Sequence, residues 1–291
     1  MKLINKLLPS SRLREDPVQH KGTERYQPTR LHNVKLIPPV KNRILAYRKK
    51  ADCEFKLESG KKLSVIVPYR DRKEHLIKFV PAISKVLQDQ SIDFEIIIVE
   101  QYNDKPFNIG SLRNIGCLHA DGDYFAIHDV DFLPKGIDYR CPSHPLRLLT
   151  HTYDEEGSKI DTWGEDYFSG VMLITKEQMT LVNGYSNLYM GWGFEDDDFL
   201  FRFLNVGLVP FFDTEGKFIC LPHISNNPHL SGVDDKIAKS RLQANKERYS
   251  RVKRDIDSSD CDGLRQLVYQ IIDDTAENID GLPYRLIKVD F

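Results

Sequence analysis

Residues 124–134 read YFAIHDVDFLP, an apolar run that ends in two aspartates, Asp129 and Asp131, with a single valine between them. A short apolar run that follows a turn-like DGD is typical of a buried strand. Alternation along a strand places Asp129 and Asp131 on one side and Val130 on the other. The sequence therefore predicts a strand that presents two carboxylates at its carboxyl end.

Apolar segments and helical patterns alternate on the N-terminal side of this strand. The predicted elements are a strand at 62–69 (KLSVIVPY), a helix at 72–89, a strand at 94–100 (FEIIIVE) and a short helix at 111–120. Ser111 is the candidate N-cap of the second helix. This order of strands and helices is that of a parallel α/β sheet. Ligands bind outside the carboxyl ends of the strands in such sheets, which is where Asp129 and Asp131 are expected.

The remainder of the chain continues with further α/β elements. They are a strand at 167–175, a helix at 176–182 and a helix at 196–207 with Gly207 at its C′ position. The polar tail from about 235 is predicted to be partly helical, and it ends in the apolar YRLIKV, a candidate strand. With 291 residues the chain can form one large domain or two small ones.

The net charge of −2 conceals an uneven distribution of charge. Residues 1–50 contain 13 Lys and Arg and 3 acids, a net charge of +10, so the remainder carries −12. Such a basic arm could contact an anionic membrane surface or an acidic glycan, although packing over the acidic body of its own domain would also balance the charge. No nucleic-acid partner is expected.

Nothing in the sequence predicts a membrane span or secretion. No run of about 18 apolar residues occurs, and the apolar residues before Pro9 are too few for a secretory signal. Five cysteines are scattered without a CxxC pair, so we expect reduced thiols and no zinc cluster. The expected location is the cytoplasm, with peripheral contact at the inner face of a membrane as the alternative.

Two carboxylates as close as those of Asp129 and Asp131 repel each other unless a cation or hydrogen-bond donors lie between them. Mg²⁺ and Mn²⁺ prefer such oxygen ligands and often bridge to the phosphates of a substrate. A solvated turn or a helix cap is the simpler alternative for an isolated Asp-x-Asp pair. The placement of Asp129 and Asp131 at the end of a buried strand favours a ligand site.

A second acidic cluster follows a tryptophan in YMGWGFEDDDF, residues 189–199. The Trp192 indole suits the apolar face of a sugar, and the flanking glycines permit a mobile loop. Four acids, Glu195 to Asp198, fall in the first turn of a predicted helix, where the macrodipole favours an ionised carboxylate. One of them is a candidate general base for an alcohol acceptor. The alternative is a core tryptophan followed by acids that only cap the helix.

With both motifs in place, the chain resembles the β-1,4-galactosyltransferases and looks closest to their xylosylprotein branch. The segments that carry the resemblance are, in the order of that family, VIVPYRDR (65–72), FNIGSLRNIG (107–116), IHDVDFLP (127–134), YFSGVMLITKEQ (167–178), NGYSNLYMGWGFEDDDF (183–199) and CLPHIS (220–225). The resemblance implies a GT-A fold with a Rossmann-like nucleotide-sugar half, a mixed central sheet and an acceptor-binding half. It also implies an Mn²⁺-dependent hexosyltransferase that moves galactose from UDP-galactose to a sugar hydroxyl with inversion.

On this resemblance we divide the chain into a basic N-terminal arm (1–60), a GT-A catalytic domain (61–235) and a C-terminal helical extension that packs on it (236–291). The expected product is a β-1,4 linkage to a xylose- or GlcNAc-type acceptor, made by a soluble bacterial enzyme of surface polysaccharide synthesis. The alternatives are a transferase of the same fold that uses UDP-GalNAc and a non-catalytic glycan- or nucleotide-binding module. A phosphotransferase is disfavoured because the sequence has no P-loop or kinase signature.

The resemblance assigns the second acidic cluster to the acceptor side of the site. Asp196 matches the catalytic base, and Glu195 and Asp197 match residues that bind the acceptor sugar. Trp192 lies on the loop that closes over donor and acceptor. Tyr167 falls at the position that selects the donor, where a bulky residue goes with galactose, and it is assigned to the acceptor side as well.

The donor-binding set combines the motifs that follow the first three strands. By resemblance it comprises Pro68, Tyr69, Arg70, Arg72, Phe107, Asp129, Val130 and Trp192. Arginine suits this role because a guanidinium fork fits phosphate oxygens. The family's arginine in the FNRA-type motif is replaced by Ile109, so one diphosphate contact is expected to be missing.

By the same resemblance, Asp131 and His223 are the expected Mn²⁺ ligands. Cys220 stands where the family can place a further ligand, and Leu221 replaces the first histidine of a His-x-His pair. Cys220, His229 or a water therefore remain alternatives for completing the metal shell. Cys141 matches one half of a family disulfide, but Tyr124 occupies the partner position, so no bridge is expected.

Overall fold

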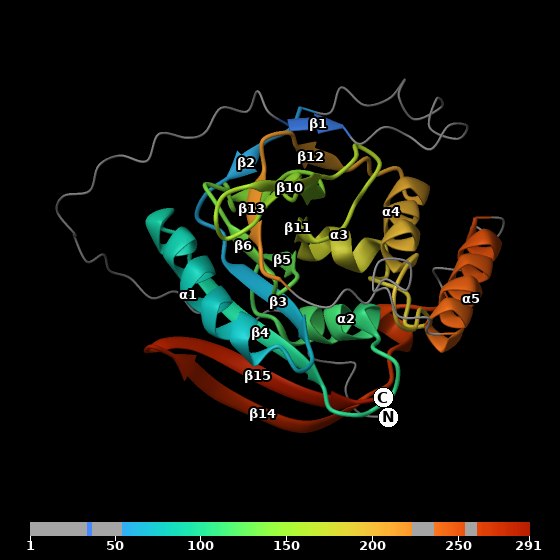
Figure 1. The fold of residues 1–291 in the computed structure, drawn as a ribbon. Helices are drawn as coiled ribbons and strands as arrows, with labels where there is room; N and C mark the ends of the chain where they lie inside the picture. Colours follow the sequence, from blue (N-terminus) through green and yellow to red (C-terminus); the bar gives the residue numbers. More distant parts are fainter. Residues whose placement is uncertain (1–33, 37–53, 223–235, 254–260) are drawn as a thin grey trace, which may run out of the picture.

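The computed structural model describes residues 34–36, 54–222, 236–253 and 261–291, and within these residues a mixed sheet of nine strands runs through the centre (Figure 1). In order across the sheet, the strands are β1 (Val34–Leu36), β12 (Phe211–Asp213), β8 (Leu146–Arg147), β11 (Val171–Thr175), β5 (Tyr124–His128), β3 (Leu63–Tyr69), β4 (Phe94–Gln101), β15 (Leu282–Asp290) and β14 (Gln270–Ile279). β3 runs parallel to both β4 and β5, as predicted, whereas β11 is antiparallel to β5.

Different helices cover the two faces of the central strands. Val65 and Val67 of β3 pack in one core cluster with α1 (Lys73–Asp89), whereas Ile66, which points the other way, packs with α2 (Ile109–His119). Burial on both faces explains why β3 is an unbroken apolar run. Gly116 allows α2 to approach β3, because a Cβ added there would lie 2.2 Å from Cγ2 of Ile66.

The other helices lie close to their predicted positions. They are α3 (Lys176–Leu181), α4 (Glu195–Asn205) and α5 (Lys236–Val252). A short 3-10 turn, η4 (Leu264–Gln266), was not predicted. Gly207 follows α4 at a φ of 80°, in agreement with its predicted C′ position. The predicted N-cap of α2 was wrong: the cap is Asn108, whose side chain accepts a hydrogen bond from the Ser111 N–H at 3.0 Å.

Two strands of the central sheet are shorter than predicted. β11 begins at Val171 instead of residue 167, because Gly170 has a φ of 79° and turns the chain just before it. Val171 pairs with His128, so β5 also ends at this point and does not extend to Asp131. Both aspartates of the first motif therefore lie beyond the strand.

A smaller sheet stands beside the turn after β5. Its strands, in order, are β10 (Lys159–Thr162), β9 (His151–Tyr153), β13 (Lys217–Cys220) and β6 (Phe132–Pro134), while β2 (Leu57–Glu58) pairs separately with β7 (Cys141–Pro142). β13 is antiparallel to β6 and places Cys220 opposite Phe132. This pairing brings β13, which is distant in the sequence, next to Asp131.

The residues predicted to form a C-terminal helical extension are helical only in part. α5 is confirmed, but residues 270–290 form the hairpin β14–β15, and β15 joins the central sheet parallel to β4 (Figure 1). Ile287 and Val289 are fully buried and anchor it. The hairpin turns at Asp280-Gly281, both at positive φ, which is a common two-residue hairpin signal. Through β15, the predicted extension therefore pairs directly with a strand of the predicted catalytic domain.

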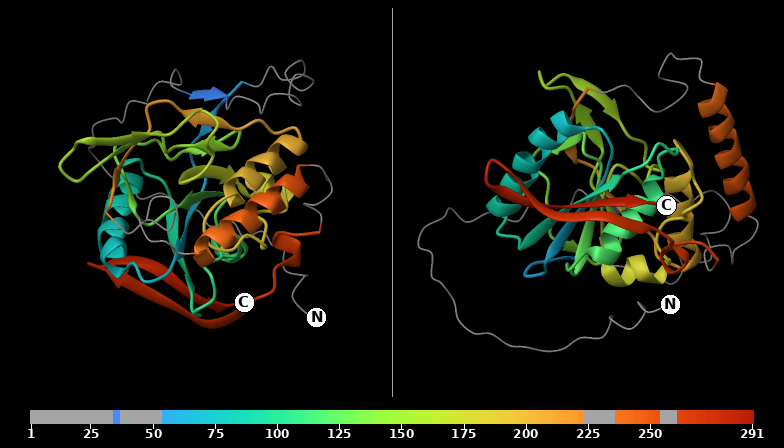
Figure 2. Two further views of the ribbon diagram at one scale, coloured as in Figure 1. Left: turned by 45° about the vertical axis from the view of Figure 1, so that its right-hand side comes forward. Right: turned by 90° about the horizontal axis from the view of Figure 1, so that it is seen from below.

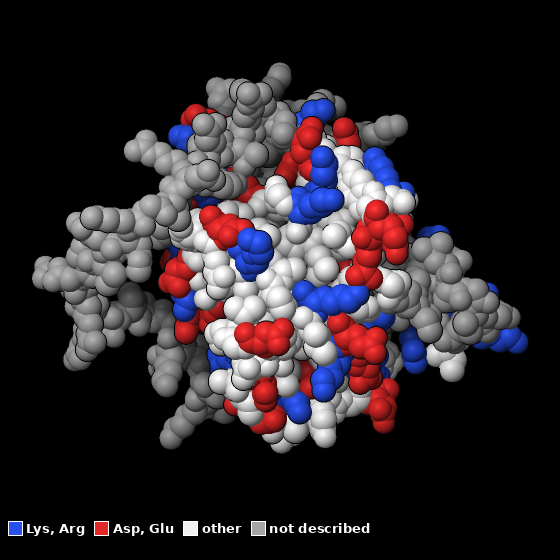
Figure 3. All heavy atoms as spheres, turned by 60° about the vertical axis from the view of Figure 1, so that its left-hand side comes forward, with Lys and Arg blue, Asp and Glu red and all other residues white. Residues whose placement is uncertain are grey.

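Only a small part of the predicted basic arm lies within the described residues. Val34–Leu36 forms the edge strand β1 on β12. On the face drawn in Figure 3, acidic and basic side chains of the described residues are interspersed, so this face is not uniformly acidic. In the described part of the chain, no helix is both long and apolar enough to cross a membrane.

Candidate active site

The turn after β5 holds Asp129 and Asp131 at the carboxyl edge of the parallel strands. Because both lie beyond the strand, the predicted alternation does not govern their directions. Backbone hydrogen bonds fix the turn instead: the Asp129 N–H donates to the Gly170 carbonyl at 3.1 Å, and the Leu221 N–H donates to the Asp131 carbonyl at 2.8 Å. The predicted position of the two carboxylates at the sheet edge is thus confirmed, by a different local geometry.

The first turn of α4 carries the second acidic cluster. Glu195 and Asp198 are buried, Asp196 is half-buried and Asp197 is exposed. Asp198 forms an ion pair with Arg202 at 3.2 Å, which gives it a structural role in the helix. Asp196 and Asp197 line a pocket beside the helix, whereas Glu195 is buried.

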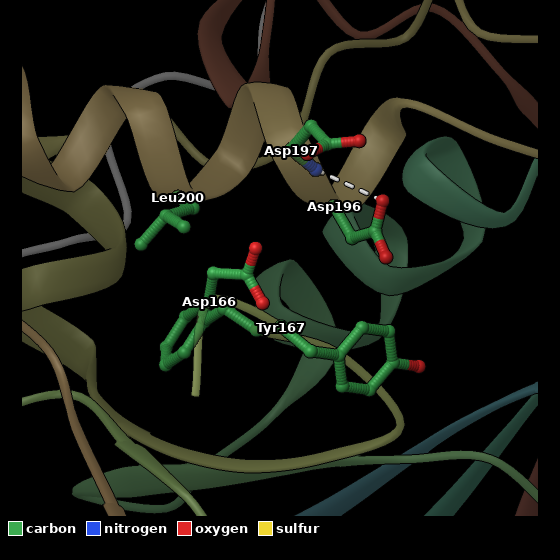
Figure 4. Close-up of a pocket in the computed structure, with 6 residues that line it drawn as sticks. Asp166, Tyr167, Asp196, Asp197 and Leu200 are labelled. Carbon is green, nitrogen blue, oxygen red and sulfur yellow. Dashed lines mark hydrogen bonds between the residues drawn. The ribbon is translucent and has the colours of Figure 1, made fainter. Parts of the chain in front are cut away.

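A pocket of about 170 Å³ opens beneath these acids. Its lining residues are Asp166, Tyr167, Phe168, Asp196, Asp197 and Leu200. Figure 4 shows Asp196 and Asp197 on α4 above Asp166 and Tyr167, which belong to the loop that leads into β11. The carboxylate of Asp196 accepts a hydrogen bond from the Asp197 N–H at 2.9 Å, which orients it. The pocket thus combines an oriented carboxylate with an aromatic wall.

Burial is the main cause that raises the pKa of Asp196 above its ordinary value, and the neighbouring charge of Asp197 adds to it. Burial and the charge of Asp196 likewise raise the pKa of Glu195. A general base is most effective when its pKa approaches the working pH. The raised pKa of Asp196 is therefore compatible with proton abstraction near neutral pH.

Arg113 of α2 is a site residue that the sequence analysis missed. Its side chain is only 1% exposed, and its Nη2 donates to Oδ1 of Asp129 at 3.0 Å. Its guanidinium also stands 5.0 Å from the centre of the Tyr185 ring. The signal available in the sequence was that Arg113 is the lone charged residue between positions 107 and 118, a stretch that includes the start of a predicted short helix.

The predicted donor residues gather at the carboxyl ends of β3, β4 and β5. Pro68 and Tyr69 end β3, and the Arg70 guanidinium lies 5.0 Å from the centre of the Phe107 ring. Nη1 of Arg70 donates to the Lys105 carbonyl at 2.8 Å and so holds the loop after β4. Arg72 stands at the N-cap position of α1, and Val130 is buried in the turn after β5. These predicted donor residues therefore lie on the three loops at this edge of the sheet, whereas Trp192 lies on a separate loop before α4.

Tyr167 is held rigidly beside the pocket. Its ring stacks on that of Trp163 with 4.5 Å between the ring centres. Arg147, which is fully buried, donates from Nη1 to the carbonyls of Gly164 and Tyr167, at 2.6 Å and 2.5 Å, and stabilises the loop from beneath. Trp163 and Arg147 were not predicted, because their roles depend on packing between distant segments. Tyr167 consequently cannot move aside without breaking this stack.

The loop that carries Trp192 packs against α5, which lies beside α4 (Figure 2). Trp192 is 43% exposed, so it is not a core residue. The buried side chain of Asn245 on α5 donates from Nδ2 to the carbonyls of Met190 and Gly193, both at 3.1 Å. An added Cβ on Gly193 would lie 2.8 Å from Cδ1 of Leu242. α5 therefore fixes the backbone on both sides of Trp192.

We expect Asn245→Ala to lower the free energy of unfolding by about 1–3 kcal/mol, because two buried carbonyls lose their donor. Hydrogen exchange of residues 190–194 should also become faster. Urea denaturation and exchange mass spectrometry measure these two effects. Gln243→Ala is the matched control, since Gln243 is exposed on the same helix and its side chain donates to the exposed Glu247 at 2.9 Å. Equal behaviour of the two variants would contradict the role of Asn245.

Comparisons with known proteins place this arrangement in a family. Residues 49–142 match the N-terminal region of glycosyl transferase group 7, and residues 151–223 match the N-terminal domain of galactosyltransferase. The chain is 31% identical to β-1,4-galactosyltransferase 7 of Drosophila melanogaster over 239 residues, which cover 78% of this chain and 69% of the relative. The protein belongs to the β-1,4-galactosyltransferase family.

Other family members match over a smaller part of their length. Mouse β-1,4-galactosyltransferase 1 is 32% identical over 224 residues, which cover 74% of this chain and 52% of that relative. The human counterpart is 33% identical over the same shares. The chain therefore spans about half the length of these two galactosyltransferases.

The expected GT-A fold is confirmed by similarity to a solved galactosyltransferase structure. The catalytic domain of Drosophila β-1,4-galactosyltransferase 7 in complex with xylobiose superposes with a TM-score of 0.62, at 29% identity, and the match covers 79% of this chain and 94% of that one. A variant of the same enzyme was solved with manganese, UDP-Gal and xylobiose. The roles of individual residues in this protein stay predictions.

The residues near Asp131 fit the metal of that family in part. A carboxylate suits Mn²⁺, whereas a thiol is a softer ligand. Burial raises the pKa of Cys220 to about 11, and the nearby charge of Asp131 contributes. Within the described ranges no three His, Cys, Asp or Glu side chains converge, and His223 and His229 lie outside those ranges. Asp131 therefore stays the predicted carboxylate ligand of Mn²⁺.

The described cysteines are free thiols. Cys141 is a buried free thiol, and the hydroxyl of Tyr124 donates to the Tyr139 carbonyl at 2.7 Å. Cys117, Cys220 and Cys261 are also free.

Proposed function

We propose that this protein is an Mn²⁺-dependent inverting galactosyltransferase that moves galactose from UDP-galactose to a saccharide hydroxyl. The observation that carries the proposal is the half-buried Asp196, whose carboxylate is oriented over the pocket beside Tyr167. We assign this pocket to the acceptor and the turn that holds Asp129 and Asp131 to the donor and the metal. Membership in the β-1,4-galactosyltransferase family supports the reaction and a β-1,4 linkage. The Drosophila relative solved with manganese, UDP-Gal and xylobiose supports the donor and the metal.

In the proposed reaction Asp196 takes the proton of the acceptor hydroxyl. The acceptor oxygen then forms a bond to the anomeric carbon of galactose, while the bond from that carbon to the β-phosphate oxygen breaks on the opposite face. UDP leaves with the electron pair of the broken bond. When bound at Asp131, Mn²⁺ would supply positive charge to the diphosphate. Arg70 and Arg72 are the protein cations that we assign to the same diphosphate.

The proposed substrate-binding roles are those that the family resemblance implies. Asp129, Val130 and Phe107 are assigned to the donor, and Glu195 and Asp197 to the acceptor sugar. Trp192 stands exposed on a loop anchored at both sides, so its indole is available to cover donor and acceptor. His223, with Cys220, His229 or a water, is proposed to complete the metal shell.

The finer parts of the proposal concern the acceptor and the setting. We propose a xylose-type acceptor, as in the xylosylprotein branch, because the matched Drosophila structures contain xylobiose. A GlcNAc-type acceptor is the alternative. We further propose a role in surface polysaccharide synthesis in the cytoplasm, with peripheral membrane contact through the basic residues near the N-terminus.

Calorimetric titration with UDP-galactose and UDP-GalNAc, each with Mn²⁺ and with a chelator, tests this function without knowledge of the acceptor. We expect binding that requires Mn²⁺ and favours UDP-galactose. A preference for UDP-GalNAc would favour the alternative transferase. Absence of binding for both donors would contradict the proposal and favour a non-catalytic module.

Replacing Tyr167 by Leu should raise the use of UDP-GalNAc relative to UDP-galactose by about tenfold or more, because the stacked ring no longer fills the space needed by the N-acetyl group. The ratio of kcat/KM values for the two donors measures this change. Tyr167→Phe is the matched control, since it keeps the ring and should leave the ratio unchanged. An unchanged ratio in the Leu variant would mean that another residue selects the donor.

A further inference from the structure

A buried positive charge lies among the carboxylates of the site. Arg113 enters from α2 and is 1% exposed, and its Nη2 holds Oδ1 of Asp129 at 3.0 Å. Its Nε and Nη1 have no hydrogen-bond partner among the described residues, and neither does Oε2 of the buried Glu195. Unsatisfied buried donors on a guanidinium are costly unless its charge interacts favourably with its surroundings.

The surroundings of Asp196 explain why such a charge is needed there. The titratable and charged groups that face Asp196 are Glu195 and Asp197 of α4, Asp166 and Tyr167 of the loop before β11, Tyr185 of the loop after α3, Tyr249 of α5 and Arg113 of α2. In this set Arg113 carries the positive charge. Burial and the neighbouring acids favour protonation of Asp196, and a protonated carboxyl cannot take a proton from an acceptor.

The charge of Arg113 acts in the opposite direction. It lowers the pKa of both Asp196 and Glu195, against the larger effect of burial. The pKa of Arg113 itself is raised, because Tyr185, Asp129 and Glu195 together outweigh its burial. The electrostatic coupling therefore joins α2, the turn after β5 and the first turn of α4.

We propose that Arg113 is a positioning residue for the transfer step: its buried charge keeps Asp196 ionised, and its Nη2 fixes the Asp129 carboxylate. The inference deepens the proposed function and rests on it, since Asp196 is the proposed base. Arg113 acts through these two aspartates and needs no contact with the substrate. Galactosyl transfer should consequently depend on the charge of residue 113 most strongly at low pH.

The test compares Arg113→Gln, which removes the charge, with Arg113→Lys, which keeps it. Transfer is measured as kcat/KM against pH, and the Asp196 carboxyl is titrated directly by ¹³C NMR, with its signal assigned from Asp196→Asn. A base works when deprotonated, so activity is present above its pKa and lost below it. We expect Arg113→Gln to move this acid limb and the NMR midpoint up by about one pH unit or more, because an opposite charge has been removed.

Arg113→Lys should leave the acid limb and the midpoint nearly unchanged but raise the donor KM, because an ammonium lacks the fork that holds Asp129. Arg202→Lys is the matched control, since Arg202 is another buried arginine and pairs with Asp198 instead. It should move neither the midpoint nor the donor KM. These three variants separate the charge of Arg113 from its shape and from the general effect of altering a buried arginine.

Two results would overturn the inference: an equal loss of rate at every pH in Arg113→Gln with an unmoved midpoint, or a shifted midpoint in Arg113→Lys. If Arg113→Gln does not fold, the lysine variant alone decides by the second criterion, and an unmoved midpoint with a raised donor KM supports the inference. Absence of transfer in the wild-type protein would contradict the proposed function. The NMR midpoints would still report on the interaction of Arg113 with Asp196, so the two failures are distinguishable.

Discussion

Asp196→Asn is expected to lower kcat for galactosyl transfer by about 10²- to 10⁴-fold, the usual contribution of a general base. The amide keeps the shape of the carboxylate but cannot accept the acceptor proton. The acid limb of the pH–rate profile should disappear as well, because the group that is lost on protonation is no longer present. Steady-state kinetics between pH 5 and 9, a range of about two units on each side of neutrality, measures both effects.

Donor binding provides the internal control for this variant. Asp196→Asn should bind UDP-galactose with Mn²⁺ about as tightly as the wild-type protein does, since the donor set lies on the other loops. Asp89→Asn, an exposed carboxylate at the end of α1 that pairs with Lys85, is the matched control and should keep full activity. A near-normal kcat in Asp196→Asn would exclude Asp196 as the base.

Asp131→Ala is expected to abolish the Mn²⁺ dependence of UDP-galactose binding and to weaken that binding by at least about tenfold, since the loss of even an outer-shell partner commonly costs this much. The physical reason is that a hard divalent cation depends on anionic oxygen ligands. Calorimetric titration of UDP-galactose at fixed Mn²⁺ concentration measures the affinity.

The wild-type protein in excess chelator is the control for this second variant. Its affinity for UDP-galactose should match that of Asp131→Ala, and the chelator should have no further effect on the variant. Thermal unfolding in chelator should then give similar midpoints for the two proteins, which excludes a general loss of structure. Unchanged Mn²⁺-dependent binding in Asp131→Ala would remove Asp131 from the metal site.

The sequence was informative wherever the structure follows from local pattern. The unbroken apolar run of β3 and the helical stripe of α1 predicted their elements, because burial on both faces or on one face leaves a distinct periodicity. The end of β5 was not predictable in this way. It depends on where β11 stops pairing, which Gly170 determines from another segment. The strand β15 was predicted only as a candidate strand. Its pairing with β4 depends on tertiary contacts that the local sequence pattern does not reveal.

The same division applies to the candidate site. Asp129, Asp131 and the acids of α4 could be found because each pair or cluster lies within one short motif. Arg113 could not be assigned, because its importance arises when α2 meets the turn after β5 and the first turn of α4. Sequence pattern alone predicts a short helix at this point and gives no partner for the charge of Arg113.

The insertion of β15 next to β4 has a consequence for how the site is made during synthesis. Strand β4 gains its second neighbour only after residues 282–290 have emerged, and until then its N–H and C=O groups on that side are unpaired. The adjoining Asp290 and Phe291 hold the loop after β4 through Asn103 and Lys105. Phe107 and the docking point of Arg70 lie in or beside this loop. The predicted donor side of the site is thus completed by residues translated long after β4, and a ribosome stalled before residue 282 would carry a chain with an open sheet edge and an unanchored loop after β4.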